Sequence, residues 1–129
     1  SCLVGSEMCI RDSRDTMLET QEYGFDKLYK NQWELGNRVR DLLKSKNIKS
    51  VAADGFRAPG VVVSYTSDEN IHNGLKFKEL GMQIAAGVPL MCDEPKSFQT
   101  FRIGLFGLDK LYNVDRTIDK LEKAFDSVL

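Results

Sequence analysis

Histidine is nearly absent from this sequence, and cysteine is scarce. The 129 residues include one histidine, His72, and three cysteines, Cys2, Cys9 and Cys92. A single histidine leaves no ligand set for a histidine-based zinc site and no basis for a Ser-His-Asp triad. The cysteines have the spacing of neither a disulfide framework nor a metal site. We therefore assign no metal site and no catalytic role to these side chains.

An excess of charge of one sign is also lacking, as are long apolar runs. The 18 Lys and Arg residues nearly balance the 19 Asp and Glu residues, which leaves a net charge of −1. This balance gives no electrostatic basis for binding nucleic acid or an acidic membrane surface. No apolar run approaches the ~20 residues that cross a bilayer. The length and the 42% hydrophobic content predict one soluble domain, and the few cysteines fit a reducing cytoplasm.

The first thirteen residues differ from the rest of the chain. Ser1 to Ser13 shows neither helical nor strand periodicity, and it lacks the pattern of a signal peptide. The stretch from Leu3 to Asp12 resembles a translated sequencing-library adapter. We expect residues 1–13 to be a non-native tail, residues 14–129 to be the native domain, and the true upstream sequence to be missing.

The remaining residues alternate between helical and strand patterns. Apolar residues at three- and four-residue steps predict a long helix from Asp15 to Lys46, broken near Gly24, with its apolar stripe in the core and charges on the other face. The other predicted elements are strands at Val61–Thr66, Gln83–Ala86 and Thr100–Leu105, a short helix at Asn73–Leu80, and a helix at Val114–Val128 capped by Asn113. This order predicts an α+β domain, with a small sheet of about three to four mainly antiparallel strands and helices packed on one face.

Arg102 is the leading candidate for a binding residue. Alternation of Phe101, Ile103 and Leu105 points Arg102 to the opposite face of its strand. A guanidinium there fits a carboxylate or a phosphonate bidentately, although a solvated strand face or a structural ion pair is the commoner explanation of such an arginine. Arg57, beside a Pro-Gly turn, is a weaker second candidate. The loop pair Asp93-Glu94 does not by itself make a glycosidase site.

A resemblance to a known family favours the binding role. The stretches Ala58–Tyr65, Ile84–Leu90 and Phe101–Leu111 are similar to the C-terminal small domain of class V aminotransferases, above all the alanine–glyoxylate and serine–glyoxylate (serine–pyruvate) enzymes. The similarity extends over about Thr16 to Leu129. These are fold-type I enzymes that depend on pyridoxal 5'-phosphate. The resemblance implies that Arg102 binds the α-carboxylate while an amino group moves from alanine or serine to glyoxylate or pyruvate.

The same resemblance implies that other parts of the site lie elsewhere. The Schiff-base lysine and most contacts to pyridoxal phosphate belong to a large domain that precedes these residues, so we assign no catalytic lysine and expect this chain alone to be inactive. The parent enzyme is expected to be a homodimer. Two alternatives remain: a 2-aminoethylphosphonate–pyruvate transaminase, and a non-catalytic module that binds amino acids for regulation. A cysteine desulfurase is less favoured, because the residues around Cys92 do not match that family's cysteine loop.

Overall fold

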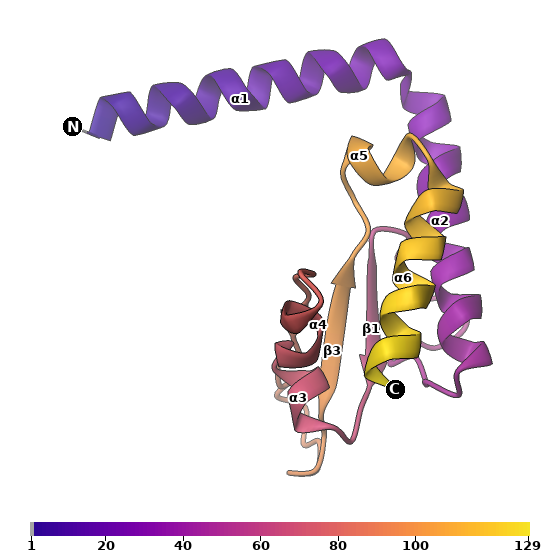
Figure 1. Ribbon diagram of the computed structural model, residues 1–129. Coiled ribbons are helices and arrows are strands. Elements are labelled where there is room, and N and C mark those ends of the chain that lie inside the picture. Colours follow the sequence, from indigo (N-terminus) through magenta and orange to yellow (C-terminus); the bar gives the residue numbers. More distant parts are fainter. Residues whose placement is uncertain (1) are drawn as a thin grey trace.

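The computed structural model describes residues 2–129, with side chains from Glu7 onward, as an α+β domain with one long projecting helix (Figure 1). Its elements in chain order are α1 (Cys2–Tyr23), α2 (Phe25–Ser45), β1 (Val61–Tyr65), α3 (Glu69–His72), α4 (Leu75–Glu79), β2 (Ala85–Ala86), β3 (Thr100–Gly104), α5 (Leu108–Leu111) and α6 (Val114–Val128). Helix α1 extends away from the sheet, whereas α2 and α6 lie side by side against it (Figure 1). No helix within residues 2–129 is both long and apolar enough to cross a membrane.

The sheet has three antiparallel strands in the order β1-β3-β2. Val62 and Ser64 of β1 point to the same side as Phe101 and Ile103 of β3, and all four are buried. Helices pack on this side only, as the alternation of apolar residues predicts. An isolated antiparallel bridge pairs Ser50 with Ser64 of β1, on the edge of β1 that faces away from β3. The predicted strand at 83–86 is shorter than expected, because only its last two residues pair with β3.

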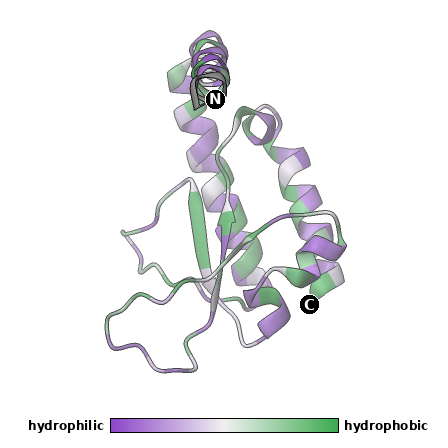
Figure 2. Cartoon of the chain, turned by 90° about the vertical axis from the view of Figure 1, so that its left-hand side faces the viewer, coloured by the Kyte–Doolittle hydropathy of each residue, from purple (hydrophilic) through white to green (hydrophobic). Residues whose placement is uncertain are grey.

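The core forms where α4, β3 and α6 meet. Phe77, Phe101 and Phe125 each have less than 2% of their surface exposed, and their ring centroids lie 5.3 to 6.4 Å apart. Aromatic pairs at these separations add about 0.5–1.5 kcal/mol beyond the area they bury. Figure 2 shows hydrophobic colour along one strand of the sheet and alternating hydrophobic and hydrophilic stretches along the helices. The three rings therefore join helices and sheet into a single core.

The long N-terminal helix is broken where expected, but it starts earlier than predicted. Gly24 has a φ of 101°, which separates α1 from α2. Helix α1 continues back to Cys2, and its described side chains are exposed as far as Glu19. A helix of this kind buries no apolar stripe, which is why no periodicity reveals it. Its local support includes the exposed i,i+4 ion pair of Arg11 with Glu7, at 3.2 Å.

The apolar stripe of α2 is fully buried only in its second half. Leu35, Val39 and Leu43 are buried, but Phe25 and Tyr29 are 62% and 66% exposed. Leu28 is partly buried against the core, so the expectation that the whole stripe packs there is wrong for Phe25 and Tyr29. Figure 1 shows the reason: the start of α2 rises beyond the end of the sheet.

The segment after β1 contains two short helices rather than the single predicted one. Asp68 caps α3, accepting hydrogen bonds from the backbone of Asn70 at 2.8 Å and Ile71 at 3.3 Å. Gly74 then adopts a left-handed conformation with φ of 80°, which no continuous α-helix accommodates. The C-terminal helix α6 has the predicted bounds, and Asn113 caps it through the backbone N–H of Arg116, at 2.9 Å.

Candidate functional site

Arg102 lies at the centre of the sheet face that no helix covers. It is in the middle strand, between Phe101 and Ile103, which are 1% and 6% exposed on the opposite face. Its cross-strand neighbours are Val63 of β1 and Ala85 of β2. The strand alternation therefore placed this side chain correctly. A half-buried guanidinium is held among small and aliphatic neighbours on an open surface.

The contacts of Arg102 leave most of its donors without an acceptor in the described part of the chain. Its Nε donates a hydrogen bond to the backbone oxygen of Ala86, at 2.9 Å. None of the ion pairs formed within residues 7–129 includes Arg102. An internal acid therefore does not hold this arginine in the described structure. Fixing Nε also fixes the plane of the guanidinium, and the two terminal nitrogens form its outward edge.

This outward edge suits a planar anion with two oxygens. Two parallel N–H groups can each donate to one oxygen of a carboxylate, which gives both strength and orientation. The rigid fork distinguishes arginine from lysine, which offers a point charge on a flexible stem. Arg102 can therefore bind and orient a carboxylate, and it has no group that could accept a proton.

The backbone oxygen of Ala86, which accepts the hydrogen bond from Arg102, is positioned by close packing between the end of β2 and β3. Gly87 follows Ala86, and a Cβ at this glycine would collide with the backbone and side-chain oxygens of Thr100. Thr100 is itself buried, and its backbone oxygen lies 2.6 Å from Nδ1 of His72. His72 therefore supports the first residue of β3, a structural role that no sequence pattern indicated.

The other candidates from the sequence do not join Arg102. Arg57 pairs with Asp54 in the loop before β1. Glu94 accepts hydrogen bonds from the backbone of Met91 at 3.0 Å and Cys92 at 2.8 Å. These bonds, that from Cys92 foremost, lower the pKa of Glu94 to about 2. The acidic loop pair therefore contributes a turn-stabilising carboxylate and not an acid–base catalyst.

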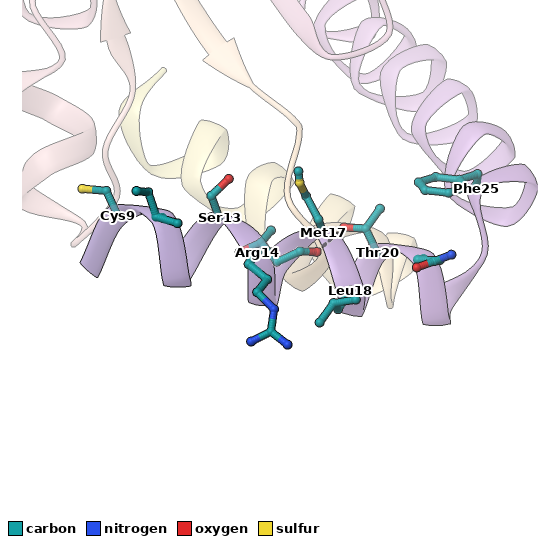
Figure 3. Close-up of a pocket in the computed structure, with 10 residues that line it drawn as sticks. Cys9, Ser13, Arg14, Met17, Leu18, Thr20 and Phe25 are labelled. Atoms are coloured by element: carbon teal, nitrogen blue, oxygen red, sulfur yellow. Dashed lines mark hydrogen bonds between the residues drawn. The ribbon is translucent and has the colours of Figure 1, made fainter. Parts of the chain in front are cut away.

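A broad cavity lies along α1 and at the corner with α2, on the opposite end of the molecule's helical arm from the sheet core (Figure 3). It has a volume of about 910 Å³, and its apolar lining includes Ile10, Met17, Leu18 and Phe25. Figure 3 shows Met17 and Phe25 on one side of the helix axis and Leu18 on the other, so the lining does not converge on one point. Exposed polar side chains, among them Cys9, Ser13 and Arg14, alternate with these apolar residues, so the surface is mixed and we assign it no catalytic role.

Arg40 is the charged residue that the sequence analysis missed. It was grouped with the charged face of its helix, yet only 7% of its surface is exposed. It lies one turn after Gly36, which is buried against Pro59, so the spacing of four residues was the available signal. The expectation that charges of this helix occupy the outer face is wrong at this position.

Comparison with known proteins supports the fold. No protein-family model matches the sequence, and no curated protein sequence matches it. The structure is similar to that of serine palmitoyltransferase from Sphingomonas wittichii, with a TM-score of 0.51 and 16% sequence identity. The match covers 79% of this chain and 23% of the other, so this chain spans less than a quarter of that protein. At this identity the likeness shows a shared fold alone, and the similarity to class V aminotransferases remains a prediction.

Proposed function

We propose that this chain supplies the substrate-binding arginine of a fold-type I aminotransferase that depends on pyridoxal 5'-phosphate. Arg102 binds the α-carboxylate of alanine or serine as amino donor, and that of glyoxylate or pyruvate as acceptor. The observation that carries the proposal is an arginine at the centre of an open sheet face, tied through Nε to Ala86 and without a described carboxylate partner. The likeness in fold to a serine palmitoyltransferase, an enzyme named for an amino-acid substrate, supports the same class of substrate.

The residues described here do not themselves form a pyridoxal phosphate site. A Schiff-base lysine needs a desolvated pocket that favours its neutral form. Among the described side chains, Arg40 is the only charged residue that is buried, and no lysine is. We therefore assign the cofactor to a large domain that covers the open face, and we derive no chemical step from this chain alone. The part of Arg102 is to bind and to orient.

One arginine is sufficient for both halves of an amino transfer. The donor amino acid and the acceptor 2-oxo acid each carry a carboxylate next to the reacting carbon. A bidentate contact from one arginine to that carboxylate positions the reacting carbon in the same place for the donor and for the acceptor, which reduces the entropic cost of reaction. The proposal includes a homodimeric parent enzyme located in the cytoplasm.

The geometry favours a carboxylate over a phosphonate. The outward edge of Arg102 presents two terminal nitrogens, because Nε is already bonded to Ala86. A carboxylate uses both oxygens on this edge, whereas a phosphonate retains a third oxygen for which this chain offers no described donor. A 2-aminoethylphosphonate–pyruvate transaminase is therefore the second choice. A regulatory amino-acid module would use the same arginine without any catalytic domain.

The decisive experiment expresses this chain together with its upstream coding sequence and measures pyruvate formation from alanine and glyoxylate. We expect activity that depends on added pyridoxal phosphate, and a fall in kcat/KM of at least 100-fold in Arg102→Lys. Arg116→Lys is the matched control, because Arg116 is an exposed arginine of α6 whose side chain contacts only a backbone oxygen. Activity that survives in Arg102→Lys would overturn the proposed role. An upstream region without aminotransferase activity would favour the regulatory alternative.

A further inference from the structure

A second cationic surface lies on the side of the sheet opposite Arg102. The cavity between the end of α2, the segment 47–54 and β1 has a volume of about 550 Å³. It is lined by four cationic and two acidic side chains, together with neutral residues. The cations are Arg40, Lys44, Lys49 and Arg57, and the acids are Asp41 and Asp54. A volume of this size is typical of small-molecule sites.

The inner wall of this cavity contains a buried charge without a described counter-ion. The guanidinium of Arg40 donates to the backbone oxygens of Gly36 at 3.3 Å, Ala58 at 2.6 Å and Val61 at 3.2 Å. No carboxylate within residues 7–129 pairs with it. Burial, and then the nearby Arg57 guanidinium, lower the pKa of Arg40 below its usual value. A buried cation of this kind is costly unless an anion approaches it.

Three buried polar atoms in the same wall have no hydrogen-bond partner in the described structure. They are Nε of Arg40 and the hydroxyl oxygens of Ser50 and Ser64. The bridge between Ser50 and Ser64 places these two hydroxyls on neighbouring positions of one sheet face. Buried polar atoms in proteins nearly always have a partner, so three from the lining of one cavity point to a ligand with several acceptor oxygens.

We propose that this cavity binds a phosphate-bearing small molecule, with Arg40, Ser50 and Ser64 in its wall and Lys44, Lys49 and Arg57 at its mouth. A phosphate group has three oxygens that accept hydrogen bonds, which matches donors spread over several side chains better than the two oxygens of a carboxylate do. Lys44, Lys49 and Arg57 are exposed, and access of the phosphate to the buried donors requires their side chains to turn aside. Asp54 pairs with Arg57 and offsets part of its charge, but four cations against two acids still leave the lining with an excess of positive charge.

The site is independent of the proposed aminotransferase function. Ser64 and Arg102 lie on opposite faces of the sheet, since they occupy strand positions of opposite orientation in β1 and β3. Arg102→Met is therefore expected to leave phosphate binding unchanged. Failure of either proposal can be recognised without reference to the other.

The test titrates the full chain with inorganic phosphate at constant ionic strength and follows backbone amide resonances by NMR. We expect saturable shifts at Ser50, Ser64 and Arg40, and acetate at the same concentration should not reproduce them. The double variant S50A/S64A should weaken phosphate binding at least ten-fold. It keeps Arg40 and its backbone contacts, so it avoids the folding defect expected of an Arg40 variant.

Charge at the mouth is tested with a matched pair of variants. Lys44→Gln combined with Arg57→Gln should weaken phosphate binding at least ten-fold, whereas Lys120→Gln combined with Lys123→Gln removes the same charge from an exposed part of α6 and should change it less than two-fold. Equal effects of the two pairs would show a nonspecific response to net charge and would overturn the site. Absence of saturable shifts in the unmodified chain would overturn it as well.

Discussion

Arg40 and Arg102 share a side chain and differ in almost every contact. Arg40 lies on the helix-covered side of the sheet and donates to three backbone oxygens, whereas Arg102 lies on the open side and donates to one. The carbonyls around Arg40 belong to α2, to the turn before β1 and to the first residue of β1, so this arginine connects the helix to the sheet. Arg102 donates one hydrogen bond within its own sheet, and its other N–H groups have no acceptor in the described structure. The comparison teaches that an arginine's role follows from how many of its donors the fold already uses.

The largest expected effect is the difference in unfolding free energy between an apolar substitution on the helix-covered face of the sheet and one on its open face. Phe101→Ala should lower the free energy of unfolding by about 3–5 kcal/mol, because it removes a ring packed between two others. Val63→Ala on the open face should cost less than about 1 kcal/mol, since its side chain is half-buried. Urea unfolding followed by circular dichroism measures both. Equal losses would mean that the open face contributes to the core as much as the covered one.

The second effect contrasts the two arginines directly. Arg40→Met should destabilise the chain by about 3 kcal/mol, because three buried backbone oxygens lose a charged donor. Arg102→Met should change the stability by no more than about 0.5 kcal/mol, as other replacements on exposed faces do. Chemical unfolding of both variants provides the measurement. A large loss in Arg102→Met would assign that arginine a structural role and weaken the case for carboxylate binding.

The third effect concerns how closely α2 approaches the turn that Arg40 holds. A Cβ at Gly36 would lie 2.7 Å from the backbone oxygen of Pro59, so Gly36→Ala should destabilise by about 1–3 kcal/mol. Gly60→Ala is the control, because its Cβ would meet only a side-chain carbon of Phe106 at 3.5 Å, an ordinary contact. Thermal unfolding of the two variants distinguishes them. If Gly36→Ala left the stability unchanged, α2 and the backbone at Pro59 would have to lie further apart than the structure shows.

The smallest effect is on the loop between β2 and β3. Backbone hydrogen bonds lower the pKa of Glu94 from its ordinary value of 4.5 to about 2 in the folded chain. The carboxylate therefore stabilises the folded loop fully above pH 4.5, and this contribution is lost as the pH falls through about 2. A pH titration of the Glu94 side-chain carboxyl carbon by NMR should report a midpoint near 2. In Glu94→Gln the Met91 and Cys92 amides should lose this acid transition, and a midpoint above 4 in the unmodified chain would contradict the hydrogen bonds.

Sequence patterns were most informative where one face of an element is apolar. Alternation in 100–105 gave the orientation of Arg102, and the stripe of α6 with its Asn113 cap gave that helix's bounds. Where burial depends on distant partners, the patterns failed. Phe25 and Tyr29 continue the apolar stripe of α2, but they lie past the end of the sheet and stay exposed. Arg40 is buried although it was expected on the charged face, because it donates to a backbone oxygen in the turn before β1. The four-residue helix α5 was missed because its length is too short for a period to show.

The brevity of β2 has a consequence for how the chain behaves at high concentration. An unpaired outer strand is a template onto which another molecule can add its own strand, and this is how many β-proteins aggregate. Here the outer strand offers only two paired residues, Ala85 and Ala86, and prolines follow at 89 and 95. Proline has no backbone N–H to donate to a neighbouring strand, so addition of a strand from another molecule along the β2 edge is limited to a few residues.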